Sequence, residues 1–189
     1  MRCDNLPVTG GCGECARKID GEQMLWRSRS SITLLGAIAL LLASGIANAA
    51  TVVALGASNT FGKGVSRSQA YPAQLEALLR ARGISVHVVN AGINGNTTGE
   101  MLARLNSAVP RGTSVVILQP GGNDRRKGAT DQTAAIESRL SAMGVKLVML
   151  DNGMLHGLPH QPDGQHLTPE GYHMLAEALV GQVAAALGK

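Results

Sequence analysis

The sequence is poor in cysteine and aromatic residues and has no long apolar run beyond its N-terminal region. All three cysteines precede residue 16, and aromatic residues make up 2% of the 189 positions. The rest of the chain therefore cannot be stabilised by disulfides and must rely on a packed core. No later segment approaches the roughly 18 consecutive apolar residues of a transmembrane helix, so we do not expect a membrane-spanning protein.

The charge of the chain is low and scattered. From Ala50 onward there are twelve Lys and Arg against nine Asp and Glu, a net of +3. A nucleic-acid-binding surface would concentrate basic residues on one face, with aromatic residues between them. The sequence has neither feature, so we expect no nucleic-acid partner.

A short apolar stretch over residues 32–43 has the features of an export signal. Arg27 and Arg29 precede it, and Ala47-Asn48-Ala49 follows with the small-x-small pattern of a signal-peptidase site. We predict a signal peptide over residues 24–49 that is cleaved after Ala49, and hence a periplasmic or secreted protein. An uncleaved N-terminal anchor is the alternative.

The signal peptide leaves residues 1–23 unexplained. Signal peptides begin close to their start codon, and Met24 lies directly before the charged region. We therefore interpret residues 1–23 as an upstream extension or a misassigned start. Cys12 and Cys15 could form half of a zinc site or a redox pair, but no histidine and only one further cysteine lie nearby. We expect no metal there.

Residues 50–189 alternate between short β-branched runs and amphipathic stretches. The runs 51–55, 86–90, 114–119 and 146–150 are apolar on both alternations, as in strands covered on both faces. This pattern predicts one α/β domain, a three-layer α/β/α sandwich with a short parallel sheet of four or five strands. The helix residues expected to face the core are Tyr71, Leu75, Leu78 and Leu79; Met101, Leu102 and Leu105; Ile136, Leu140 and Met143; and Tyr172, Leu175, Leu179 and Val183.

Helix-end signals support these boundaries. Thr168 and Pro169 are an N-cap and a first-turn residue for the last helix. Gly83 and Gly144 fall where helices should end.

Polar residues suited to catalysis follow the predicted strands. Ser58 follows the first strand, and Asp163 and His166 precede the last helix. A serine hydroxyl is a weak nucleophile unless an imidazole takes its proton and a carboxylate orients that imidazole. Because active sites of parallel sheets form beyond the carboxyl ends of the strands, these residues are expected to lie close together.

Four short motifs in order carry a resemblance to a known family. They are Leu55-Gly-Ala-Ser58, the segment 90–98 with Gly95, Gly121-Gly-Asn-Asp124 and Asp163-Gly-Gln-His166. With these motifs the chain resembles the SGNH hydrolases of the GDSL esterase/lipase superfamily, and most closely their compact bacterial thioesterase/lysophospholipase/arylesterase branch. The resemblance extends over about residues 51–187.

The resemblance implies a role for each motif. Ser58 would be the nucleophile, His166 the general base and Asp163 the residue that orients the imidazole. The backbone N–H groups of Ser58 and Gly95 and the side-chain amide of Asn123 would form the oxyanion hole. The implied activity is hydrolysis of small-molecule carboxylic esters or thioesters, including lysophospholipids, through an acyl-enzyme. No cofactor and no stable membrane insertion after signal cleavage are implied.

The chain departs from the family pattern in two places. Ala57 stands where the family has aspartate, and Asn59 where it has leucine. The segment between Asn123 and Asp163 is short enough for only one strand, so four strands are favoured over five. These departures keep open an alternative in which the same fold is a non-catalytic module that binds carbohydrate or lipid.

Several residues also permit simpler interpretations. Ser58 could be a helix N-cap. His156 and His160, with Asp163 and His166, could suggest a metal site, but Gly157 and Pro159 interrupt the helix that such a site would need, and we expect no metal.

Two further segments near the predicted site remain open. The basic segment 125–127 could hold an anionic group or be a solvated turn. The loop 151–161, with Met154, Leu155 and Leu158, is expected either to cover a sheet edge or to line an acyl pocket.

Overall fold

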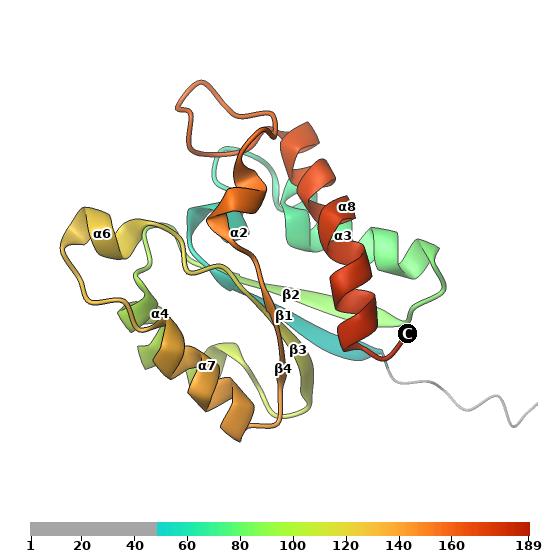
Figure 1. The fold of residues 1–189 in the computed structure, drawn as a ribbon. Helices are drawn as coiled ribbons and strands as arrows, with labels where there is room; N and C mark the ends of the chain where they lie inside the picture. The colour runs from blue at the N-terminus through green and yellow to red at the C-terminus, as the bar shows by residue number, and fades with distance from the viewer. Residues whose placement is uncertain (1–48) are drawn as a thin grey trace, which may run out of the picture. The chain divides into compact units, whose positions relative to one another are not determined.

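A four-stranded parallel sheet lies at the centre of the computed structural model, which describes residues 49–189. Its strands are β1 (Ala50–Gly56), β2 (Val86–Gly92), β3 (Thr113–Leu118) and β4 (Lys146–Met149), in the order β2-β1-β3-β4 (Figure 1). The predicted strands and the parallel sheet are confirmed, with four strands. The predicted signal peptide and upstream extension fall on residues 1–48, outside the described residues, apart from Ala49.

Helices cover both faces of the sheet and complete the three predicted layers (Figure 1). One face packs against α3 (Tyr71–Ala81) and α8 (Pro169–Ala186). The other packs against α4 (Thr98–Ala103), α5 (Leu105–Ala108) and α7 (Thr133–Ala142). The remaining elements are short: α2 (Ser58–Phe61), α6 (Asn123–Lys127) and the 3₁₀ helices η1 (Arg67–Gln69) and η2 (Asn152–Leu155). In the part of the chain that the structure describes, no helix is long and apolar enough to cross a membrane.

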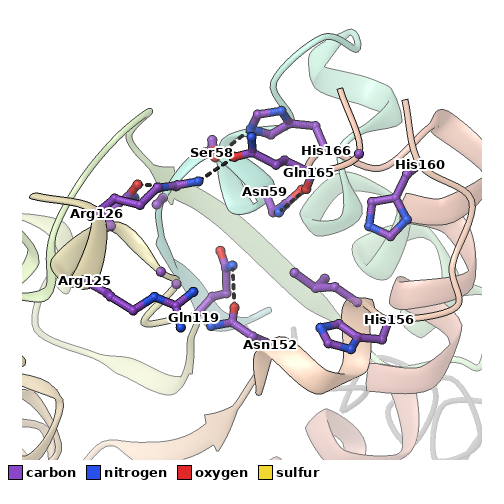
Figure 2. A pocket seen from close by; sticks show the side chains of 16 residues that line it. Ser58, Asn59, Gln119, Arg125, Arg126, Asn152, His156, His160, Gln165 and His166 are labelled. Carbon is purple, nitrogen blue, oxygen red and sulfur yellow. Dashed lines mark hydrogen bonds between the residues drawn. The ribbon is translucent and has the colours of Figure 1, made fainter. Parts of the chain in front are cut away.

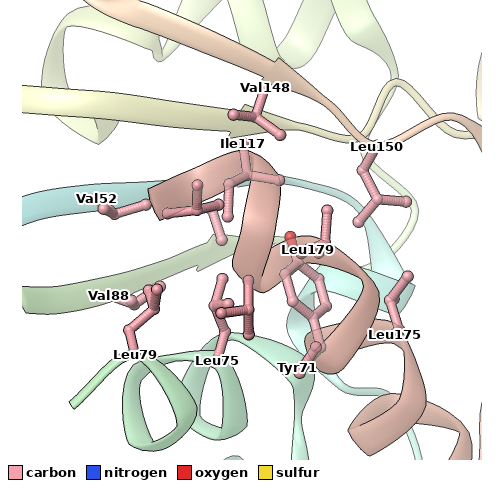
Figure 3. Close-up of a cluster of buried hydrophobic side chains, with 14 of the residues drawn as sticks. Val52, Tyr71, Leu75, Leu79, Val88, Ile117, Val148, Leu150, Leu175 and Leu179 are labelled. Atoms are coloured by element: carbon pink, nitrogen blue, oxygen red, sulfur yellow. The ribbon is translucent and has the colours of Figure 1, made fainter. Parts of the chain in front are cut away.

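Alternate residues of the central strands enter two separate cores. Val52 and Ala54 of β1 belong to the core under α3 and α8, whereas Val53 and Leu55 belong to the core under α4, α5 and α7. Figure 3 shows the first core, where leucines of α3 and α8 meet valine and isoleucine side chains of the sheet. Burying each such side chain contributes about 1.5–3 kcal/mol. Because both faces are covered, the strands read as continuous apolar runs in the sequence.

The predicted helix ends are present, with one correction. The Thr168 hydroxyl accepts a hydrogen bond from the N–H of Gly171, 3.1 Å away, and Gly83 and Gly144 have φ values of 76° and 71°. The prediction that Met143 faces the core is wrong, because α7 ends at Ala142 and the Met143 side chain is 37% exposed.

The two tyrosines of the chain lie in or beside the core of α3 and α8. Burial raises the pKa of Tyr172 to about 12 and raises that of Tyr71 even further. In the unfolded chain tyrosine ionises near pH 10. The folded state therefore holds these protons more tightly, so its stability is fully present below about pH 10 and falls as the pH rises through 12.

An alkaline titration tests this burial. We expect the ultraviolet absorbance of tyrosinate to remain absent until about pH 12 and then to appear together with the loss of helical circular dichroism. A tyrosinate signal that rises near pH 10 while the circular dichroism is unchanged would contradict it.

The segment between β4 and α8 returns across the carboxyl end of the sheet. His160 and Leu167 form an isolated antiparallel bridge, and the N–H of Gln161 donates to the His166 carbonyl over 2.7 Å. The Gln161 side chain also donates to the carbonyl of Lys63, in the loop after α2. These bonds fix the position of the loop that carries Asp163 and His166.

Candidate active site

Ser58 and His166 are hydrogen-bonded although they lie far apart in the sequence. Ser58 is the first residue of α2, directly beyond β1, and its Oγ is 2.9 Å from Nε2 of His166. The N-cap position of α2 is Ala57, and no side chain caps this helix. The interpretation of Ser58 as a helix cap is therefore wrong, and its hydroxyl faces an imidazole instead (Figure 2).

Asp163 holds the other side of the imidazole. Its Oδ2 is 2.5 Å from His166 Nδ1, and its Oδ1 accepts the backbone N–H groups of Gln165 and His166 over 2.9 and 3.0 Å. The hydrogen bond from the imidazole, helped by these two N–H groups, holds the pKa of the Asp163 carboxyl well below its usual range. An ionised carboxylate accepts a hydrogen bond from Nδ1–H, so Nε2 presents its lone pair to Ser58.

Gly95 and Asn123 lie beside the same serine. With Ser58 and His166 they line a hollow of about 250 Å³, here called the side hollow. Gly95 has a φ of 74°, which favours glycine. Asn123 is buried at the start of α6, and its Nδ2 donates to the carbonyl of Asn96 over 2.7 Å. The second hydrogen on this nitrogen is free to bind a developing oxyanion.

Asn123 is also held by Arg126, which the sequence analysis did not assign to the site. Arg126 donates to Asn123 Oδ1 and to Gln165 Oε1, each over 2.5 Å, and thereby connects α6 to the histidine loop (Figure 2). Lys127 lies 3.5 Å from Glu100. Both residues are exposed, as expected for a solvated segment, but Arg126 also connects two parts of the site.

Replacement of Arg126 tests whether it orients the Asn123 amide. We expect Arg126→Ala to lower kcat about tenfold with little change in KM. Without Arg126 the Asn123 amide would no longer be directed at the oxyanion, which forms only in the transition state. Arg126→Lys retains the charge without the two-pronged geometry and should restore only part of the rate. An unchanged kcat in both variants would show that Asn96 alone positions the amide.

Arg104 is a second contributor that the sequence did not reveal. Its guanidinium donates to Asn96 Oδ1 and to the Ala91 carbonyl, each over 2.8 Å, and to the Gly56 carbonyl over 3.3 Å. Partial burial lowers its pKa. Arg104 thus connects the ends of β1 and β2 to the loop that carries Gly95. In the sequence it is an unremarkable basic residue of an amphipathic helix.

The two departures from the family pattern have different consequences. Ala57 is buried in the core under α4, α5 and α7, and it offers no carboxylate beside Ser58. Asn59 donates to the Gln165 carbonyl and accepts from the Tyr172 hydroxyl, both over 3.1 Å. It therefore fastens the Ser58 turn to the histidine loop and to α8.

Asp124, next to the oxyanion candidate, has a structural role. Its carboxylate is buried and accepts the backbone N–H and the hydroxyl of Thr98, the hydroxyl over 2.9 Å. This pair fixes α6 against the start of α4, and so helps to place Asn123.

A larger hollow of about 280 Å³, here called the main hollow, also borders Ser58 and shares Asn123, Arg126, Gln165 and His166 with the side hollow (Figure 2). Leu155 is the one large aliphatic side chain in its lining within the described residues, whereas Gln119, Asn152, His156 and His160 present polar groups. Leu155 is only 7% exposed and is also part of the core of α3 and α8, against which Met154 and Leu158 pack. All three apolar residues of the loop 151–161 therefore cover this core, and Leu155 also lines the hollow.

The described residues contain no cluster of three or more histidine, cysteine or acidic side chains arranged to hold a metal ion. His160 Nδ1 lies 2.7 Å from the Leu158 carbonyl, and His166 is held by Ser58 and Asp163. The geometry therefore supports proton transfer at Ser58 and offers no arrangement for metal catalysis in this part of the chain.

Comparison with known proteins is consistent with this geometry. Residues 54–147 match the model of the GDSL-like lipase/acylhydrolase family. The chain is 31% identical over 126 residues to esterase TesA of Pseudomonas aeruginosa; the match covers 64% of this chain and 63% of TesA.

Two solved structures share the fold. A crystal structure of TesA superposes with a TM-score of 0.64 at 22% identity, covering 72% of this chain and 99% of the chain in that structure. AlinE4, an SGNH-hydrolase family esterase, gives a TM-score of 0.52 at 22% identity, covering 75% of this chain and 82% of AlinE4. The two solved structures show a shared fold, and the family match together with the similarity to TesA shows that the chain belongs to the SGNH/GDSL superfamily.

Proposed function

We propose that the protein is an exported serine esterase that cleaves carboxylic esters or thioesters through an acyl-enzyme on Ser58. The observation that carries this proposal is the hydrogen-bond chain from Asp163 through His166 to Ser58. It ends beside Gly95 and Asn123, so an acyl group placed against Ser58 would also meet donors for an oxyanion.

In the acylation step, the Ser58 oxygen attacks the acyl carbon while His166 Nε2 takes the hydroxyl proton. The ionised Asp163 stabilises the imidazolium that forms. The carbonyl oxygen becomes an oxyanion, which would be stabilised by the N–H groups of Ser58 and Gly95 and the amide of Asn123. Each such donor contributes about 3 kcal/mol to lowering the barrier.

The intermediate then collapses, and His166 returns the proton to the leaving alcohol or thiol. In deacylation, His166 takes a proton from water, and the hydroxide formed attacks the Ser58 ester. A second collapse releases the carboxylic acid and restores the Ser58 hydroxyl. Apart from the substrate and a water molecule, these steps use the side chains and backbone N–H groups of this chain.

The lining of the main hollow supports short acyl groups. A long acyl chain needs a continuous apolar wall, because apolar surface gains about 25 cal/mol per Å² only when it leaves water for apolar surroundings. The main hollow offers Leu155 and Ala57 among amides, imidazoles and guanidinium groups. We therefore propose acetyl to butyryl esters as the preferred range.

A chain-length series tests both the activity and this preference. Nitrophenyl esters from acetyl to dodecanoyl are offered to the purified protein, and kcat/KM is measured for each. We expect hydrolysis of the acetyl and butyryl esters and a fall of at least tenfold toward dodecanoyl. Absence of hydrolysis at every length would reject the esterase proposal and favour the binding module, and preference for dodecanoyl would reject the short-acyl range alone.

Export rests on the sequence of residues 24–49. Expression of the full chain in a bacterial host, followed by N-terminal sequencing of periplasmic protein, tests it. We expect a mature chain that begins at Ala50. Uncleaved protein confined to the cytoplasm would contradict the proposal.

A further inference from the structure

Both hollows beside Ser58 are lined by positively charged side chains. Arg125 and Arg126 line the main hollow, and Lys63, Arg126 and Lys127 line the side hollow. Within the described residues, neither lining includes an aspartate or glutamate. The catalytic carboxylate of Asp163 is not part of either lining and is occupied by His166 and two backbone N–H groups. The arginine and lysine side chains that line the two hollows therefore face no carboxylate within these linings.

Arg125 differs from Arg126, the other arginine of the main hollow, because nothing in residues 49–189 binds its guanidinium. Arg126 donates to Asn123 and Gln165, and Lys127 lies beside Glu100. The side chain of Arg125 makes no hydrogen bond or salt bridge in this part of the chain. It reaches toward Gln119 and Asn152 on the wall of the main hollow, across from His156 (Figure 2).

Two carboxylates near Arg125 are committed elsewhere. Asp124 and Asp131 line an adjoining hollow that shares Arg125, Asn152 and two glycines with the main hollow. Asp124 accepts from Thr98, and Asp131 accepts from the N–H and hydroxyl of Thr133 over 2.8 and 2.6 Å. Neither forms a salt bridge with Arg125, so its charge is not neutralised by a neighbour within the described chain.

We propose that Arg125 is a specificity-determining residue that binds an anionic group of the ester substrate in the main hollow. This inference rests on the proposed esterase function and names its substrate class: short esters that carry a carboxylate or a similar anion near the scissile bond. A guanidinium presents parallel N–H donors that match a carboxylate in a two-pronged geometry. Asn152 and His156 line the same hollow and could add further donors.

An anionic group explains this lining better than a neutral one. A neutral acyl group would leave the guanidinium solvated and gain nothing from its charge. An anion would form a charge-assisted hydrogen bond, which is roughly twice as strong as a neutral one. It would also be drawn toward the site by the cations of both hollows, with a salt-dependent effect.

The test compares ester pairs that differ only in charge. One pair is monoethyl succinate and its neutral amide, ethyl succinamate, with the anion in the acyl half. The other pair is 4-acetoxybenzoate and 4-acetoxybenzamide, with the anion in the leaving group. Ratios of kcat/KM, anionic over neutral, are measured for the unmodified protein, Arg125→Gln and the control Arg111→Gln. Arg111 is exposed and lines a hollow that shares no residue with the main hollow or the side hollow. Its replacement by glutamine changes the net charge by the same amount as Arg125→Gln.

We expect a ratio of about five to ten for at least one pair, and the pair that shows it identifies which half of the ester carries the anion. Arg125→Gln should reduce that ratio to about one, whereas Arg111→Gln should leave it unchanged, and added salt should reduce it in the unmodified protein.

Hydrolysis of the neutral esters without an anionic preference would overturn this inference and leave the esterase proposal standing. A preference that persists in Arg125→Gln would overturn the assignment to Arg125. Absence of hydrolysis of all four esters would overturn both.

Discussion

Replacing Ser58 by alanine is expected to lower kcat/KM for a short nitrophenyl ester by roughly 10⁴- to 10⁶-fold. The reason is chemical, since Ser58 is the hydroxyl hydrogen-bonded to His166 Nε2 and the proposed mechanism forms the acyl intermediate on it. His166 would retain Asp163 as its partner but would have no hydroxyl to activate. Residual hydrolysis above the buffer rate is expected, because the oxyanion donors and the binding surface remain.

Ser141→Ala provides the matched control for this substitution. Ser141 is exposed on α7, outside both hollows, so the same chemical change there should leave kcat/KM within about twofold. Thermal unfolding of Ser58→Ala should confirm that its fold is intact. Retention of more than a hundredth of the activity in a folded Ser58→Ala protein would contradict the nucleophile assignment.

Replacing Asp163 by asparagine is expected to lower kcat about 10⁴-fold. An asparagine can offer its N–H₂ to His166 Nδ1, which then favours the tautomer with the proton on Nε2. That tautomer cannot accept the proton of Ser58. The effect is a loss of the correct tautomer, so KM should change much less than kcat.

The pH profile distinguishes this role from a structural one. Because the pKa of Asp163 lies well below its usual range, its carboxyl stays ionised in mildly acidic solution and should not contribute to a loss of activity there. The stability that this carboxylate contributes is present above the pKa of an unfolded aspartate, near 4, and is lost only as the pH falls through the lower folded value. Asp163→Asn should therefore lose activity at every pH.

Asp151→Asn is the control for the carboxylate. Asp151 caps η2 by accepting the N–H of Gly153, a bond that an asparagine oxygen can also accept. Its kcat should stay near that of the unmodified protein. A kcat for Asp163→Asn within tenfold of the unmodified value would show that the carboxylate does not orient His166.

The sheet could be predicted from sequence because its strands are buried on both faces. Val52 to Leu55 enter two cores in alternation, so every position is apolar and the run is easily recognised. Met143 misled the same reasoning, because it follows the helical period but lies just past the end of α7. Gly144 marks the end of this helix, but the period alone does not show that Met143, the C-cap residue before it, is partly exposed.

The residues of the proposed triad were predictable because they lie in short motifs at strand ends. The supporting residues were not. Their contributions depend on hydrogen bonds to other segments of the chain. Asn59 and Arg126 each donate to Gln165 in the histidine loop, and Arg104 donates to Asn96 in the loop that carries Gly95. Such bonds depend on how the loops fold over the sheet, and composition and spacing do not reveal that. For the same reason Arg126, in a short basic run, was indistinguishable from a solvated residue.

The most direct test of the central claim is the reaction of the protein with a fluorophosphonate probe, followed by peptide mass spectrometry. A serine reacts rapidly with such a probe only when a neighbouring base activates it. We predict one adduct per chain, located on Ser58, whose formation is lost in Ser58→Ala and slowed at least a hundredfold in His166→Ala. No adduct, an adduct on another residue, or equally fast labelling of His166→Ala would contradict an activated serine at the carboxyl end of this sheet.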